Sequence, residues 1–228
     1  MSHHKGRVFL VGCGATGRIV LHLEKFARMQ GLTHIFSFMA GGDAALIKSI
    51  ELVEDHADLG KKHLQEFSPN NEDMVIGVTE GGETSYVIGA VNHASAIGAK
   101  SHIIYCNDDD QIYSTCHRCA EFINNPKIEN ISLNVGPMAL AGSTRMQAST
   151  VLHLALAHIL FDTDETALIK KISSFNCVGL SELAKSEAEF FQDGVSVIYQ
   201  TSPNYGLTVL TDTTERAPTF GLNPFENI

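Results

Sequence analysis

One strand–turn–helix segment constrains the fold most, because its apolar run at residues 74–78 leads through a glycine-rich turn into a helix. A short apolar run of this kind is typical of a buried parallel strand. Gly81 and Gly82 allow a sharp turn and close approach of a ligand, and Thr84 or Ser85 can cap the following helix. The free amides and the dipole of a helix start bind phosphate without basic side chains. The segment therefore predicts a phosphate-binding loop, although an ordinary strand-to-helix turn has the same composition.

Composition narrows the classes of partner. The chain has 228 residues, enough for one large domain or one domain and part of another, and its formal net charge is −10. This charge argues against a nucleic-acid partner and against binding to a membrane surface. The sequence shows no apolar run of membrane-spanning length and no signal-peptide pattern at its start. An acidic chain must hold a phosphate mainly with backbone amides and hydroxyl groups.

The cysteines indicate a reducing compartment. Their number is five, which is odd, and this favours reduced thiols in the cytoplasm. Cys116 and Cys119 have the spacing of half a zinc site, but no second pair completes it. We interpret them as two thiols one turn apart on a helix, and expect neither a metal nor a cofactor.

Apolar runs and helical periodicities alternate along the chain, which predicts an α/β fold with a parallel sheet. The expected strands are residues 7–12, 34–40, 74–79, 101–107 and 128–135. The expected helices are residues 16–30, 44–54, 84–98 and 111–124, a long apolar helix ending near 161, and a further helix from there to about 191.

In parallel sheets, ligands bind beyond the carboxyl ends of the strands, at the point where the strand order reverses. The loops after the first, third and fifth strands each combine glycine with serine or threonine, and we expect them to gather there. Residues 12–17 also match the Gly-x-Gly-x-x-Gly dinucleotide pattern, but no acidic residue closes the second strand. Three hydroxyl-rich loops at one edge favour a phosphate-bearing ligand.

Four motifs carry a resemblance to a known family. They are Gly12-Cys-Gly-Ala-Thr-Gly-Arg18, Met39-Ala-Gly-Gly-Asp43, Val53-Glu-Asp55 with Gly60, and Gly136-Pro-Met-Ala-Leu-Ala-Gly-Ser-Thr-Arg-Met146. In this order and spacing, residues 7 to about 160 resemble the sugar isomerase (SIS) domain of the N-acetylmuramic acid 6-phosphate etherases and the glucokinase regulatory protein. The resemblance implies a three-layer α/β/α sandwich with a five-stranded parallel sheet, sugar-phosphate binding, and pairing of two SIS domains.

The candidate ligand-binding residues lie in the three loops, and most match hydroxyl or glycine positions of the family. They are Gly14, Thr16, Thr79, Gly81, Gly82, Glu83, Thr84, Ser85, Ser143 and Thr144. The chain departs from the etherases in the third loop, where Gly81 and Glu83 replace Ser and Arg.

Two acidic residues are candidates for catalysis. Glu51 and Glu54 lie three residues apart, on one face of the predicted helix, and match acidic positions that approach the sugar in the family. Glu54 matches one of two catalytic glutamates of the etherases, whereas Phe26 stands at the position of the other. The resemblance therefore implies a protein that binds a phosphorylated sugar or amino sugar, either isomerase-like or regulatory. The alternative is an etherase-type lyase that uses Glu54 as acid or base.

The end of the chain resembles the start of a second SIS unit. Residues 195–200 look like its first strand, and Glu215 matches the glutamate that the first unit lacks. We expect a SIS domain with C-terminal helices over residues 1–190 and an incomplete second unit over 191–228. Such a chain is expected to form a homodimer or to pair with a second SIS unit.

Overall fold

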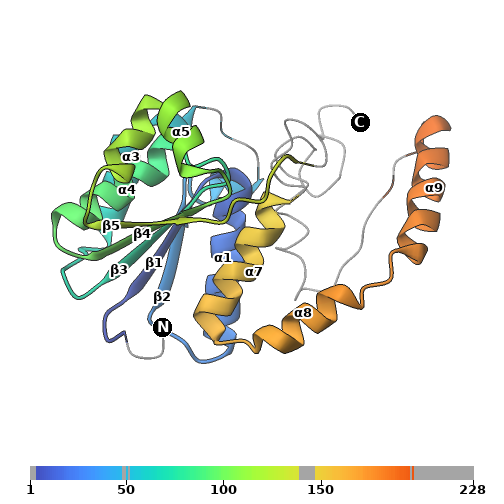
Figure 1. The fold of residues 1–228 in the computed structure, drawn as a ribbon, viewed down its shortest axis with the longest axis horizontal. Helices are drawn as coiled ribbons and strands as arrows, with labels where there is room; N and C mark the ends of the chain where they lie inside the picture. The colour runs from blue at the N-terminus through green and yellow to red at the C-terminus, as the bar shows by residue number, and fades with distance from the viewer. Residues whose placement is uncertain (1–3, 48–49, 51, 139–146, 196, 198–228) are drawn as a thin grey trace.

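In the computed structural model, the described residues are 4–47, 50, 52–138, 147–195 and 197. They include a five-stranded sheet of order β2-β1-β3-β4-β5, in which all neighbouring strands are parallel. The strands are β1 (Val8–Gly12), β2 (Ile35–Met39), β3 (Met74–Val78), β4 (Lys100–Tyr105) and β5 (Ile128–Ser132). Helices cover both faces of the sheet (Figure 1), so the predicted three-layer α/β/α sandwich is confirmed.

The α-helices, in chain order, are α1 (Gly14–Met29), α2 (Ala44–Ile47), α3 (Ala57–Glu66), α4 (Ser85–Ala96), α5 (Asp109–Thr115), α6 (Ala120–Ile123), α7 (Ala148–Phe161), α8 (Glu165–Ser173) and α9 (Val178–Gln192). Two short 3₁₀ helices are η1 (Val53–Asp55) and η2 (His117–Cys119).

The central strand β1 sends alternate side chains to the two faces of the sheet. Val8 and Leu10 are buried against α1 and α7, which lie side by side on one face (Figure 1). Phe9 and Val11 are buried on the opposite face, where the core includes Tyr86 of α4. The apolar run of β1 is therefore buried on both sides, as expected for an inner parallel strand.

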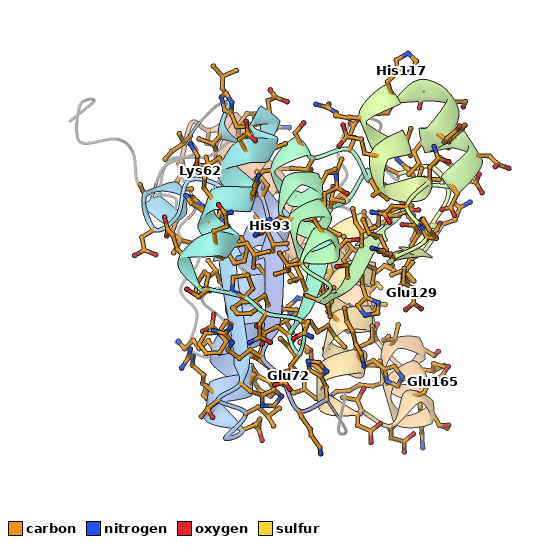
Figure 2. All side chains as sticks on the ribbon, turned by 90° about the vertical axis from the view of Figure 1, so that its left-hand side faces the viewer. Lys62, Glu72, His93, His117, Glu129 and Glu165 are labelled. Carbon is orange, nitrogen blue, oxygen red and sulfur yellow. The ribbon has the colours of Figure 1, made fainter. Side chains whose placement is uncertain are left out.

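Helices α3 and α4 touch through their backbones on the second face. A Cβ atom on Gly60 of α3 would lie 1.9 Å from the Tyr86 carbonyl oxygen, and one on Gly89 of α4 would lie 2.0 Å from the Ala57 carbonyl oxygen. Figure 2 shows the two helices next to each other, with Lys62 on α3 and His93 on α4. Because no side chain separates them at these points, α3 fixes the position of α4 and of the loop that leads into it.

Three predicted helices differ from the structure. Residues 44–54 do not form one helix, because Leu52 has a left-handed φ of 70° between α2 and η1. The segment 111–124 divides into α5, η2 and α6, since Ser114 and Thr115 each donate a side-chain hydrogen bond to the Gln111 carbonyl and compete with helical pairing. The helix expected up to residue 191 is two helices, α8 and α9. Helix α3 was not predicted.

Helices α8 and α9 extend away from the sheet (Figure 1), and none of their residues is buried. Residues 198–228, on which the predicted second unit depends, lie outside the described residues. No helix in the described ranges is both long enough and apolar enough to cross a membrane.

A pair of histidines joins α1 to α7. His22 Nδ1 lies 3.1 Å from His153 Nε2, and their rings meet edge to face. Burial, together with the nearby His22, lowers the pKa of His153 from 6.5 to about 4. His153 is therefore neutral in the folded protein at pH 7, and it contributes to packing between the two helices.

We expect the folded state to lose stability as the pH falls from about 6.5 towards 4. In this window the unfolded chain binds a proton at residue 153 that the folded chain does not, so the free energy of unfolding falls by about 2 kcal/mol at pH 5. Urea unfolding at pH 7 and pH 5 should show that His153→Gln removes about this much of the pH dependence. His158→Gln on the same helix is the control and should retain it. Equal pH dependence in all three proteins would contradict the prediction.

Candidate functional site

The strand order reverses next to β1. The chain passes from β1 outward to β2 and then returns to place β3 on the other side of β1. The loops after β1 and β3 are therefore neighbours at the carboxyl edge of the sheet, where open parallel sheets bind ligands. This confirms the expected proximity of the first and third loops.

The loop after β1 is held by its own threonine. Gly14 has a left-handed φ of 54°. The Cys13 amide donates to Thr16 Oγ1 at 3.1 Å, and the Thr16 hydroxyl donates to the Cys13 carbonyl at 2.9 Å. Thr16 is only 3% exposed, so the hydroxyl predicted to bind a ligand instead fixes the start of α1.

The loop after β3 is anchored by its carbonyl groups. The Cys106 amide donates to the Glu80 carbonyl at 3.0 Å, and Asn107 Nδ2 donates to the Gly81 carbonyl at 3.0 Å. The Cys119 thiol donates to the Gly82 carbonyl at 3.5 Å. Three consecutive carbonyls are therefore turned towards β4 and the start of α6.

This anchoring determines where the amides point. In a trans peptide the C=O and the following N–H point in opposite directions, and the described residues contain no cis peptide bond. The amides of Gly81, Gly82 and Glu83 consequently point away from the anchoring groups. Within the described ranges, neither these amides nor that of Thr84 donate a hydrogen bond. Consecutive free amides at a helix start form an anion-binding concavity.

The hydroxyl groups of the loop have different roles. Thr84 is the residue before α4, as predicted, but its side chain does not cap the helix. Instead, Thr84 Oγ1 lies 2.9 Å from Thr79 Oγ1, and Thr79 is only 2% exposed. Thr84 therefore stays at the partly exposed side of the loop with a hydroxyl that is not committed to the helix.

Arg118 supplies a positive charge beside the loop. Its NH1 group donates to Ser85 Oγ at 3.0 Å and lies 3.3 Å from Asp55 Oδ1. Burial lowers the pKa of Arg118, but hydrogen bonds to Cys116 and Asp55 and the nearby Glu83 carboxylate outweigh it and raise this pKa. The cation is thus held at the start of α4. Sequence reasoning missed Arg118, because the segment 116–119 was interpreted only through its cysteines.

Glu54 lies at the edge of the first loop. It is exposed on η1, and its Oε2 atom is 3.9 Å from Cys13 Sγ. Glu51 lies outside the described residues, so its predicted place beside Glu54 stays a prediction. The structure therefore brings Glu54 to the edge of the first loop.

The start of α7 packs against the third loop and the end of β4. Ser149 donates a hydrogen bond to the Glu80 carboxylate, and the Cys106 thiol donates to the Ala148 carbonyl at 3.7 Å. Ser143 and Thr144 lie outside the described residues, so their predicted place in the site remains a prediction. In the described part of the chain, no cluster of three or more His, Cys, Asp or Glu residues could hold a metal ion.

Comparisons with known proteins now identify the domain. Residues 1–95 match the family model of the glucokinase regulatory protein N-terminal SIS domain. The chain carries a SIS domain. It is 36% identical over 154 residues to N-acetylmuramic acid 6-phosphate etherases of Yersinia pestis (strain Pestoides F) and Yersinia pseudotuberculosis (serotype O:1b), an alignment that covers 66% of this chain and 48% of each relative. The chain thus spans about half the length of these relatives.

Solved structures resemble this SIS domain more distantly. Phosphoheptose isomerase GmhA from Neisseria gonorrhoeae aligns with 69% of this chain and 77% of its own, at a TM-score of 0.43 and 14% identity. The Vibrio vulnificus NanR protein complexed with ManNAc-6P aligns with 70% of this chain and 49% of its own, at a TM-score of 0.45 and 16% identity.

Proposed function

We propose that this SIS domain binds a phosphorylated sugar or amino sugar, with the phosphate on the amides of residues 81–84. The observation that supports this most is the anchoring of the three carbonyls of Glu80, Gly81 and Gly82, which leaves the following amides free to donate. Oriented backbone amides bind phosphate without requiring a basic loop, which suits a chain of net charge −10. The related etherases act on a sugar phosphate, as their name states.

Side chains around the loop complete the proposed phosphate site. Arg118 donates to Ser85 Oγ, so the Ser85 hydroxyl keeps its own hydrogen for a ligand oxygen. Arg118 itself offers a charge-assisted hydrogen bond to a phosphate. Thr84 adds a second hydroxyl to the phosphate site. The loop with Gly14 lies at the same edge of the sheet, and we propose that the sugar binds next to it. Ser143 and Thr144 belong to the proposal on the family resemblance alone.

The binding role is favoured over the etherase role. Ether cleavage needs a base and an acid, and Glu54 is one carboxylate near the loops. Phe26, at the other glutamate position, stacks edge to face on Phe161. It stands about 18 Å along α1 from Gly14, since a helix rises about 1.5 Å per residue. Glu24, the nearest acidic residue, is engaged by Arg28 and Ser37. An isomerase-like or regulatory sugar-phosphate protein therefore fits better.

Two further features belong to the proposal. The free cysteines 13, 106, 116, 119 and 177 suit a cytoplasmic protein. Helices α8 and α9 expose apolar side chains, among them Ile172, Leu183 and Phe191, which is 84% exposed. We propose that they pack in a homodimer or against a second SIS unit, because large exposed apolar surfaces favour association.

Light scattering should give a mass above that of the monomer, and a monomer at micromolar concentration would refute the pairing.

A thermal-shift screen of hexose and amino-sugar phosphates should identify a ligand, since binding to the folded state alone raises the melting temperature. Thr84→Ala should then weaken binding of that ligand by about 1–3 kcal/mol, the scale of a lost hydrogen bond to a charged group. Affinity for the same sugar without phosphate should hardly change. Thr115→Ala on α5, whose hydroxyl bonds only to its own helix, is the matched control.

Equal weakening for the phosphorylated and unphosphorylated sugar would place the phosphate elsewhere. The etherase alternative is tested on the same samples by measuring lactate release from N-acetylmuramic acid 6-phosphate. We expect none above the buffer rate. Release that Glu54→Gln abolishes would establish the lyase instead.

A further inference from the structure

Cys116 and Cys119 stand at the two ends of one tight turn. The Cys119 amide donates to the Cys116 carbonyl at 3.0 Å; Cys116 immediately precedes η2, and Cys119 is its last residue. Residues three apart that are joined by such a hydrogen bond have Cα atoms less than about 7 Å apart. A disulfide spans Cα separations of about 4.4–6.8 Å. The backbone is therefore already close to the geometry that joins these two thiols.

The two thiols differ in exposure and acidity. Cys119 is fully buried, and burial raises its pKa to about 12. Cys116 is partly exposed, and although its burial acts to raise its pKa, hydrogen bonding at its sulfur and the nearby Arg118 cation outweigh this and lower the pKa. His117, between them, points outward at the end of this segment (Figure 2). An accessible, stabilised thiolate beside a buried thiol is the arrangement of an attacking and a resolving cysteine.

The same two residues contact the third loop. The Cys119 thiol donates to the Gly82 carbonyl at 3.5 Å, and Arg118, whose positive charge helps to lower the pKa of Cys116, donates to Ser85 Oγ at the start of α4. The cysteine pair is thus linked to the loop through one hydrogen bond and one shared cation. By contrast, Cys106 is buried with its pKa raised to about 12 by burial and by Glu80, and no cysteine neighbours it along the chain.

We propose that Cys116 and Cys119 form a redox-active dithiol that a low-molecular-weight disulfide oxidises to an intrachain disulfide, and that this oxidation tightens phosphate binding at the third loop. The second half of this inference rests on the proposed function. The Cys116 thiolate attacks one sulfur of the small disulfide, which forms a mixed disulfide and releases one thiolate. Cys119 then loses its proton, attacks Cys116 Sγ and displaces the second thiolate. Two protein thiols are oxidised, and one small disulfide is reduced to two thiols.

The direction of the coupling follows from the charges. In the reduced protein the Cys116 thiolate competes with a bound phosphate for Arg118. A disulfide has no charge, so oxidation removes one of the anions that compete with the phosphate for Arg118, while Asp55 remains. Oxidation also removes the Cys119 proton and with it the hydrogen bond to the Gly82 carbonyl, but a thiol is a weak donor, whereas the contact with Arg118 is charge-assisted. Phosphate binding therefore gains more from the Arg118 cation than it loses with the hydrogen bond from Cys119 to the Gly82 carbonyl.

The dithiol is tested with oxidised glutathione on the full chain carrying Cys177→Ser, because Cys177 is exposed and would react separately. Mass spectrometry of the trypsin-digested product should show Cys116 joined to Cys119, with a loss of two hydrogen atoms. The rate at which this disulfide forms should rise with pH and level off below pH 9, because the pKa of the attacking Cys116 is lowered from 9.0. Cys116→Ser, at a partly exposed position, should form no such product, whereas Cys106→Ser should react normally. Glutathione retained on Cys116, without closure onto Cys119, would overturn the dithiol.

The coupling is tested by calorimetric titration with inorganic phosphate at pH 9, where the Cys116 thiolate predominates. The oxidised protein should bind phosphate severalfold more tightly than the reduced one, and Cys116→Ser should bind equally before and after the same treatment. Unchanged or weaker binding after disulfide formation would overturn the coupling alone. If neither form binds phosphate, the proposed function fails together with the coupling, while the mass measurement still decides the dithiol.

Discussion

The candidate site depends on hydrogen bonds that hold consecutive carbonyls of one loop, two from the end of β4 and a weaker one from the Cys119 thiol. The groups that hold the carbonyls of Glu80, Gly81 and Gly82 come from the end of β4 and from the turn before α6. Because each peptide is planar and trans, a fixed carbonyl also fixes the next amide in the opposite direction. A flexible glycine pair would otherwise have to be ordered by the ligand, and ordering a residue costs about 1–2 kcal/mol. The fold thus provides an anion site that is already organised.

The surrounding elements keep this loop in place. Gly82 has a left-handed φ of 89°, and a Cβ atom there would lie 3.1 Å from the Ile112 side chain, so α5 packs directly over the turn. The backbone contact between α3 and α4 fixes the helix that follows, and Ser149 of α7 engages the Glu80 carboxylate from the other side. Each layer of the sandwich therefore contributes to the geometry of a segment of a few residues.

Short patterns in the sequence predicted the strands and the first and third loops, because interactions between neighbouring residues determine these parts of the fold. The apolar runs gave all five strands to within a few residues, and the parallel order followed from the alternation with helices. Glycine and hydroxyl residues correctly indicated the first and third loops. The start of α4 at Thr84 or Ser85 was also predicted, but not the contact of Thr84 with Thr79, because a buried hydroxyl takes a partner that only the folded loop provides.

Features that depend on distant contacts or on side-chain competition were missed. The single helix expected over residues 44–54 is wrong, because Leu52 between α2 and η1 is left-handed. Arg118 reaches Ser85 across 33 residues of sequence, and no periodicity could show that contact. The same long-range contact links the cysteine pair to the loop. The predicted roles of Ser143, Thr144 and the second SIS unit concern residues outside the described part of the chain.

Amide chemical shifts measured during titration with a sugar phosphate test the central claim most directly, because they report on the groups that the account assigns to the phosphate. With glucosamine 6-phosphate or another ligand found by screening, the largest saturable changes in the ¹⁵N–¹H spectrum should fall on the amides of Gly81, Gly82, Glu83 and Thr84. The unphosphorylated sugar should leave these four signals unchanged. If a sugar phosphate binds while the four amides stay unperturbed and the largest changes occur elsewhere, the loop after β3 is not the phosphate site.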